Sequence, residues 1–135
     1  MEIYSFSPFG YEGAIVTVEV DLRRGIPGVD MVGLADGAVR ESRERMRSAL
    51  LNSDFQFPPE RIVISLSPAD LKKEGAGFDL AIALAVLAAS AGEGGVPEGR
   101  CLVMGELELS GKVRAVRGVN AAAATAREQG ISCCI

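Results

Sequence analysis

The sequence predicts an α+β fold, in which helices pack on a mixed α/β sheet. Apolar and polar residues alternate over residues 13–21 and 61–66, as they do in half-buried strands. Residues 80–91 carry no charge, which is typical of a buried helix. Residues 117–129 are rich in alanine and are followed by Gly130, a residue that commonly ends a helix.

The composition indicates one globular domain. The chain has 135 residues, 48% of them hydrophobic, so residues 1–135 can bury a core of their own. The net charge is −4, so the overall field does not steer the chain to DNA or anionic lipid, although a local basic patch is compatible with it. Glu2 follows Met1 where a signal peptide would be basic and then apolar. Residues 80–91 are shorter than the roughly 20 apolar residues that span a bilayer. We expect a cytoplasmic protein without a membrane partner.

The chain contains three cysteines, Cys101, Cys133 and Cys134, and no histidine. Their odd number and their spacing match no metal-binding pattern. We interpret them as reduced thiols of a cytosolic protein, at buried strand positions. The chain stops at Ile135 within a predicted strand, which suggests a fragment of a longer protein.

Three strands are predicted in the first part of the chain, over residues 2–8, 13–21 and 29–34. A turn over residues 10–13 separates the first two, and the Gly- and Pro-containing stretch 23–28 separates the second and third. Two strands around such a stretch predict an antiparallel pair.

A helix is predicted over residues 36–53. Its apolar side carries, at helical spacing, Val39, Met46, Ala49 and Leu50. Glu41 precedes Arg45 by four residues, the favourable order for an ion pair. The arginines of this helix suggest a nucleic-acid contact. However, its four arginines stand against Asp36, Glu41 and Glu44, which leaves a charge of only +1. We therefore favour a solvated, ion-paired face.

The central strand and the helix after it organise the rest of the chain. One face of the strand is apolar, at Ile62, Ile64 and Leu66. Pro68 ends the strand because it has no N–H to donate. Gly75 and Gly77 then permit a sharp bend or a close backbone approach. Asp79 is predicted to cap the following helix with its carboxylate. Such a turn can hold an anion or a nucleophile, but we favour a plain capped connection.

Charged residues cluster around this central turn: Asp70, Lys72, Lys73, Glu74 and Asp79. The cluster is the best candidate surface for an interaction, although a solvated polar turn is the favoured explanation.

The last part of the chain is predicted to continue the sheet. Residues 102–104 form a strand, and alternation on both sides of Ser110 and Gly111 predicts a hairpin with a two-residue turn. The helix over residues 117–129 and a strand from Ile131 complete the order β-β-β-α-β-α-β-β-α-β.

No motif for cofactor chemistry is present. Residues 105–112 superficially resemble a phosphate-binding loop, but five residues separate the two glycines, Val113 stands where Ser or Thr would bind magnesium, and the pattern is that of a hairpin. The lack of histidine excludes His-dependent triads and His metal sites. We expect no cofactor and no metal in this chain.

Three ordered blocks carry a resemblance to a known family. They are GIPGVDMVGLADGAVRESRERMRSALLNS over residues 25–53, ISLSPADLKKEGAGFDLAIA over 64–83, and GELELSGKVRAVRGV over 105–119. The blocks resemble the YifB/ComM proteins, the magnesium-chelatase-like AAA+ ATPases of bacteria. The resemblance covers nearly the whole chain.

This resemblance implies that the chain is the N-terminal domain, with the fold of ribosomal protein S5 domain 2 that the proteolytic domain of Lon protease shares. It implies that an AAA+ ATPase module follows, so that ATP and Mg2+ are cofactors of the full-length protein. The implied partners are that module, a homo-hexamer, and DNA, on which ComM-like proteins drive branch migration in transformation and recombination.

The resemblance to Lon raises the question of peptidase activity. A Lon-type peptidase has a Ser nucleophile in a Gly-Pro-Ser-Ala-Gly turn and a Lys on the helix after the later hairpin. Gly77 and Asn120 occupy the matching positions here. Gly has no nucleophile, and Asn is no general base near neutral pH, so we predict that this chain is not an enzyme. Ser65 or Ser67 could instead form a Ser-Lys pair with Lys72 or Lys73. We give this pair little weight, because neither serine has a base at a fixed spacing along the sequence.

Three functions therefore stand beside one another. The favoured one is a non-catalytic accessory and assembly domain of the ATPase, and the alternatives are a Ser-Lys hydrolase and a stand-alone nucleic-acid-binding module. The candidate residues for contact with nucleic acid or with another domain are Arg23, Arg24, Arg40, Arg43, Arg45, Arg47, Lys72 and Lys73. Binding of nucleic acid would weaken with added salt.

Overall fold

The computed structural model describes residues 2–9, 12–33, 36–68, 73, 75–91, 100–131 and 133–135. The strands are β1 (Glu2–Phe9), β2 (Glu12–Arg23), β3 (Gly28–Val32), β4 (Arg61–Ser67), β5 (Arg100–Leu102), β6 (Glu106–Leu107), β7 (Val113–Arg114) and β8 (Cys133–Cys134). The helices are α1 (Gly37–Arg40), α2 (Ser42–Asn52), α3 (Asp79–Ala91) and α4 (Val119–Glu128).

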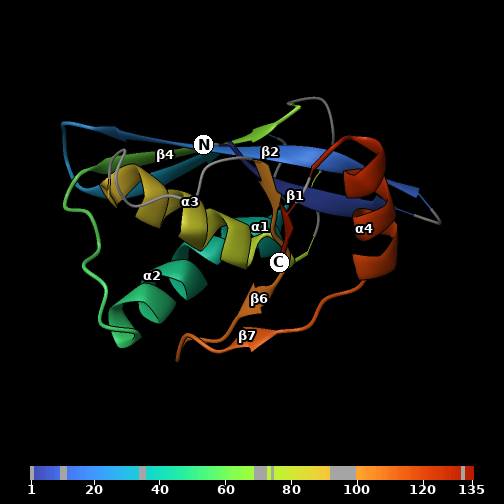
Figure 1. Cartoon of the computed structure of the whole chain (residues 1–135). Helices are drawn as coiled ribbons and strands as arrows, with labels where there is room; N and C mark the ends of the chain where they lie inside the picture. The colour runs from blue at the N-terminus through green and yellow to red at the C-terminus, as the bar shows by residue number, and fades with distance from the viewer. Residues whose placement is uncertain are drawn as a thin grey trace.

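The strands form a mixed six-stranded sheet in the order β3-β4-β2-β1-β5-β8, and β6 and β7 form a separate pair. The neighbours β1–β2 and β2–β4 are antiparallel, whereas β3–β4, β1–β5 and β5–β8 are parallel. Figure 1 shows the sheet along the top of the molecule, with α2 and α3 below it and α4 at its right-hand end. This architecture confirms the predicted α+β class. Among the residues that the structure describes, every helix is too short or too polar to cross a membrane.

The prediction that the second and third strands form an antiparallel pair is wrong, because β4 lies between them. Val18 of β2 is in register with Leu66 of β4, and Ile64 of β4 is in register with Met31 of β3. The helices between β3 and β4 form a crossover, which allows two parallel strands to become neighbours. The predicted turn over residues 10–13 falls partly outside the described residues, and β2 already begins at Glu12.

The predicted helix over residues 36–53 is present as α1 and α2, which meet at Glu41. Its start is confirmed, since Asp36 is the N-cap and accepts a hydrogen bond of 2.8 Å from the N–H of Val39. Its end is confirmed at Ser53, the C-cap of α2. The predicted apolar side is buried, at Val39, Met46, Ala49 and Leu50.

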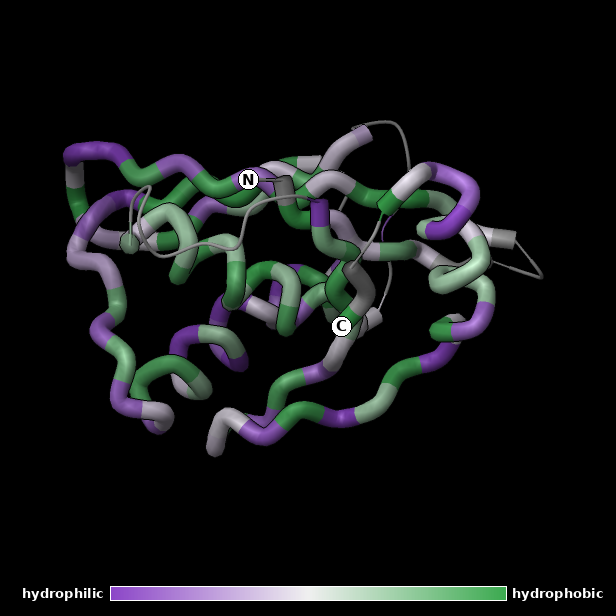
Figure 2. Tube along the Cα trace, in the orientation of Figure 1, coloured by the Kyte–Doolittle hydropathy of each residue, from purple (hydrophilic) through white to green (hydrophobic). Residues whose placement is uncertain are grey.

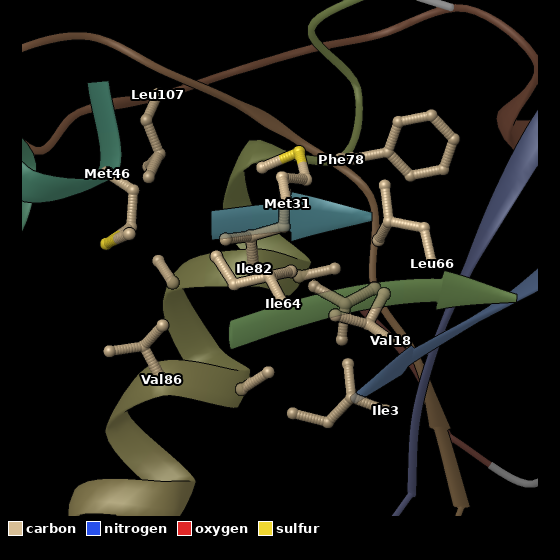
Figure 3. Packing of buried hydrophobic residues seen from close by; sticks show 14 of the residues in the cluster. Ile3, Val18, Met31, Met46, Ile64, Leu66, Phe78, Ile82, Val86 and Leu107 are labelled. Atoms are coloured by element: carbon tan, nitrogen blue, oxygen red, sulfur yellow. The ribbon is translucent and has the colours of Figure 1, made fainter. Parts of the chain in front are cut away.

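The larger hydrophobic cluster lies between one face of the sheet and the helices α2 and α3. The predicted inward face of β4 is fully buried, at Ile62, Ile64 and Leu66. In Figure 3, Ile64 and Leu66 lie beside Met31 of β3, Val18 of β2 and Ile82 of α3. The tube of α3 is mostly hydrophobic in colour in Figure 2, and its buried residues confirm the predicted buried helix.

A second hydrophobic cluster lies on the opposite face of the sheet. Side chains alternate along a strand, so Ile3 of β1 points into the first cluster whereas Tyr4 and Phe6 point into the second. Two alanines of α4, Ala122 and Ala126, cover these aromatic rings and are almost fully buried. The sheet is therefore covered by helices on both faces.

The end of α4 confirms the predicted role of Gly130. This residue has a φ of +72°, and its N–H donates to the carbonyl of Arg127. The N–H of Ile131 donates to the carbonyl of Ala126 at 2.8 Å, which completes a Schellman motif. The chain then turns back to the sheet and forms β8.

The predicted hairpin is present, but its turn is longer than predicted. The N–H of Glu108 donates to the carbonyl of Lys112, and the N–H of Gly111 donates back to the carbonyl of Glu108. Three residues thus form the loop, and Gly111 adopts a φ of +98°, as the last residue of such a loop commonly does. In addition, β5 ends at Leu102 and β6 is a separate strand, so the predicted order lacks one strand.

The interpretation of all three cysteines as reduced thiols is wrong for Cys101, which is disulfide-bonded. The parallel pairing of β5 with β8 places Cys101 in register with Cys133. Residues about thirty positions apart thus become neighbours through the sheet, and the spacing of cysteines along the chain does not reveal this.

Candidate functional site

The turn before α3 contains the position that matches the Lon nucleophile. The carbonyl of Gly77 accepts a hydrogen bond of 3.1 Å from the N–H of Gly105. A Cβ atom at Gly77 would meet Val116 at 3.8 Å, an ordinary van der Waals contact, so a small side chain would fit there. Asn120, which matches the lysine position, is exposed in the first turn of α4. These two positions hold neither a hydroxyl group nor an amine.

A buried carboxylate lies two residues after Gly77. Asp79 is fully buried and accepts hydrogen bonds from the hydroxyl of Ser42, from Arg45 Nε at 2.6 Å and Nη2 at 3.0 Å, and from the N–H of Leu107 at 3.0 Å. These donors come from α2 and β6, so one side chain ties both elements to the start of α3. Burial of a carboxylate is tolerated when it is paired and hydrogen-bonded in this way.

The prediction that Asp79 caps its own helix is wrong. The N–H of Leu80, in the first turn of α3, donates to the carbonyl of Gly105, and the N–H of Ile82 donates to that of Phe78. Backbone groups thus satisfy part of this helix start, and the carboxylate turns toward a charged partner. A charged donor gives a stronger hydrogen bond than a neutral amide.

The prediction that the arginines of this helix form a solvated face is wrong for Arg45. Its side chain is only 19% exposed and is paired with Asp79, and it also donates to the carbonyl of Ala38 at 2.8 Å. The hydrogen bond that Arg45 donates to Asp79 raises the pKa of the Arg45 guanidinium above its ordinary value, so this group stays charged. The predicted ion pair with Glu41 is confirmed at 3.5 Å.

The charged cluster around the central turn was predicted to be an interaction surface. This prediction is wrong for the two members that the structure describes. Lys73 and Asp79 are both fully buried, and Lys73 Nζ donates to the carbonyl of Pro68. Asp70, Lys72 and Glu74 lie outside the described residues. Ser65 and Ser67 are half-buried and alternate with the buried residues of β4, so they lie on the sheet face opposite α3.

The phosphate-loop resemblance of residues 105–112 has no counterpart in the structure. This stretch forms the β6–β7 hairpin, and the N–H groups of Gly105 and Gly111 donate to carbonyls of the chain. Within the described ranges, no three His, Cys, Asp or Glu residues lie together in a way that could hold a metal ion.

A groove of about 550 Å³ lies between α2, the start of β3 and the segment that leads into β4. Its lining combines proline and aromatic side chains with charged ones: Pro27, Gly28, Val29, Arg43, Glu44, Arg47, Leu51, Phe57, Pro58 and Pro59. The guanidinium carbon of Arg47 lies 5.5 Å from the centre of the Phe57 ring, within the range of a cation–π contact.

Of the candidate cations, two line this groove together, Arg43 and Arg47. The other candidate cations that the structure describes are not part of this lining. Arg23 is exposed and paired with Asp21 at 2.7 Å, Arg24 is exposed directly after β2, and Arg40 is exposed on α1. Lys72 lies outside the described residues. The sequence analysis missed Phe57 as a site residue. Its signal was the aromatic and proline segment that directly follows an arginine-rich helix.

Comparison with known proteins gives one matching family, described as subunit ChlI of magnesium chelatase, over residues 18–135. The chain is 44% identical to competence protein ComM of Haemophilus influenzae over 117 residues, which is 87% of this chain and 23% of ComM. It is 41% identical to the uncharacterized protein YifB of Escherichia coli K12 over 128 residues, 95% of this chain and 25% of YifB. The chain spans about a quarter of the length of these relatives.

Proposed function

Because the chain belongs to the family of subunit ChlI of magnesium chelatase, with ComM and YifB among its relatives, we propose that it is a non-catalytic accessory domain of a longer magnesium-chelatase-like ATPase. In this proposal the domain is N-terminal, packs against the AAA+ module of the same protein and helps the modules to assemble as a hexamer. ATP and Mg2+ belong to that module, and the full-length protein acts on DNA in the cytoplasm. We further propose the S5 domain 2-like and Lon-like fold.

The observation that carries the non-catalytic role is the chemistry of the two dyad positions. Gly77 and Asn120 supply no nucleophile and no base, although the space beside Gly77 would accept a serine side chain. The nearby buried lysine, Lys73, donates to a backbone carbonyl, and the buried Asp79 is occupied by Arg45 and Ser42. Lys73 and Asp79, the charged residues of this turn that the structure describes, thus have structural partners.

A peptidase assay tests the absence of catalysis. The chain is incubated with casein and with a fluorogenic peptide, beside an active Lon protease as the positive control. We expect no turnover above the rate without protein. Turnover that Ser65→Ala or Ser67→Ala abolishes would establish a hydrolase instead and overturn the proposal.

The assembly role is tested on the longer protein. Its ATP hydrolysis and its sedimentation are measured with and without residues 1–135. We expect removal of the domain to shift the hexamer toward smaller species at equal protein concentration, because an interface is lost. Unchanged sedimentation and unchanged ATP hydrolysis would contradict the assembly role.

A nucleic-acid contact by this domain itself is a second candidate, and the observation in its favour is the pair Arg43 and Arg47 in one groove with Phe57. A titration of the chain with single- and double-stranded DNA at several salt concentrations tests it. Binding through these arginines would weaken steeply with salt. No binding at low salt removes this candidate.

A further inference from the structure

The edge of the sheet at β3 provides the first observation. β3 is the outermost strand, and within the described residues β4 is its only strand partner. An outer strand presents unpaired N–H and C=O groups to any chain that comes alongside. Large apolar side chains are exposed near both ends of this strand: Ile26, two residues before it, is 83% exposed, and Val32, its last residue, is 50% exposed.

The charge that could guard this edge is already paired. Asp30 in the middle of β3 binds Arg61 of β4 through two hydrogen bonds, of 2.6 and 2.8 Å. This pair neutralises both side chains on the face away from α2. Within the described residues, the edge of β3 therefore has no second strand partner, has exposed apolar residues beside it, and carries no charge other than the paired Asp30.

The groove described above begins at this edge. Pro27, Gly28 and Val29 form its strand side, and α2 forms the other side. In Figure 1 the green segment after α2 rises along the left side of the molecule to β4, and this segment contributes Phe57 to the lining. An extended chain beside the start of β3 would thus lie against a helix and an aromatic ring.

The charges of the groove select the chemistry of its occupant. The lining contains two arginines, Arg43 and Arg47, and one carboxylate, that of Glu44, so it is basic although the whole chain carries −4. Leu51, 50% exposed, adds apolar surface on the same side. A nucleic acid has no peptide backbone to pair with the strand edge. An acidic peptide would place carboxylates beside the arginines and backbone hydrogen-bond partners beside the edge of β3.

We propose that the groove between α2 and β3 binds an extended acidic polypeptide segment, which pairs with β3 as an added strand. Its carboxylates meet Arg43 and Arg47, and its apolar side chains contact Leu51 and Phe57. Strand addition of this kind obtains affinity from main-chain hydrogen bonds and specificity from side-chain pockets. This inference goes beyond the proposed assembly role, because it holds whichever protein supplies the segment.

The probe is a fluorescein-labelled peptide of alternating Glu and Val, titrated with the chain by fluorescence anisotropy. We expect saturable binding that weakens with added salt. A control peptide of the same length, with alternating Lys and Val, should not bind. The double variant Arg43→Glu, Arg47→Glu should weaken binding at least about tenfold, since a tenfold change corresponds to about 1.4 kcal/mol.

The matched control is the double variant Arg23→Glu, Arg24→Glu. It changes the net charge equally at exposed residues that do not line the groove. Binding that both double variants weaken equally would reflect the overall charge and overturn the assignment of the groove. Circular dichroism of both variants establishes that they are folded.

N-methylated peptides test strand pairing itself. N–H groups alternate between the two edges of an extended peptide, so methylation of one alternating set blocks one edge only. We expect one set to abolish binding and the other to leave it intact. Equal tolerance of both sets would contradict strand addition. Binding of an oligothymidine, lost in the Arg43→Glu, Arg47→Glu variant, while the Glu-Val peptide does not bind, would replace the proposal with a nucleic-acid surface.

Discussion

Asp79 contributes to the structure through a charge that water does not reach. Its carboxylate is fully buried, and its donors are Ser42 and Arg45 of α2 and the N–H of Leu107 in β6. Removing a charge from water costs several kcal/mol, and only charged and hydrogen-bonded partners offset this cost. The side chain thus connects α3 to segments that lie 28 to 37 residues away along the chain.

We predict that Asp79→Ala destabilises the fold by about 3–5 kcal/mol, because Arg45 then loses its buried carboxylate partner while its own side chain stays largely buried. Urea unfolding followed by circular dichroism measures the change. If this variant does not fold, Ser42→Ala removes one hydrogen bond to the carboxylate and should cost about 1.5–3 kcal/mol.

The matched control for this prediction is Asp21→Ala. It breaks an ion pair of similar length with Arg23, but both side chains are more than 60% exposed. An exposed pair contributes at most about 1 kcal/mol. Equal losses of stability in Asp79→Ala and Asp21→Ala would mean that the buried pair has no special structural role.

Helix α4 packs on the sheet through small side chains on one side. Ala122 and Ala126 are one helical turn apart, and both contact the cluster around Tyr4 and Phe6. Alanine at these positions lets the helix backbone approach the aromatic rings closely. The alanines between them, such as Ala123, are exposed.

We predict that Ala122→Leu destabilises the protein by about 1–3 kcal/mol, because the larger side chain overpacks a filled interface. Ala123→Leu, the same change one residue later, should alter stability by less than about 0.5 kcal/mol. Thermal unfolding of the two variants measures the difference. A stabilising effect of Ala122→Leu would show that space remains between α4 and the sheet.

The molecule as a whole has two hydrophobic clusters that share one sheet. β1 supplies Ile3 to the first cluster and Tyr4 and Phe6 to the second. Unfolding of β1 would therefore disrupt both clusters. A single domain of this size commonly unfolds in one cooperative transition.

We predict that Ile64→Ala, in the first cluster, lowers the free energy of unfolding by about 2–5 kcal/mol. The unfolding transition followed through Tyr4, in the second cluster, should give the same loss of stability. The chain has no Trp, so Tyr4 fluorescence in a Tyr11→Phe background reports on the second cluster. Circular dichroism reports on the helices. Two separate transitions by these probes would show that the faces of the sheet unfold independently.

Local patterns were sufficient for most elements. The alternation in β4, the apolar run of α3 and the glycine after α4 each depend on residues within one segment, so the sequence predicted them correctly. The same holds for the N-cap at Asp36 and for the ion pair of Glu41 with Arg45. These interactions join residues within about one helical turn, where spacing alone determines which side chains meet.

The amino-acid sequence by itself determined where most strands and helices lie, the buried apolar faces of β4 and α2, and the absence of a nucleophile and a base at Gly77 and Asn120. Only the tertiary structure decided that β4 lies between β2 and β3, that Arg45 turns inward to Asp79, and that Arg43, Arg47 and Phe57 share a groove. The reason is physical: backbone pattern acts over a few residues, whereas strand order and the burial of a charge depend on contacts between distant segments.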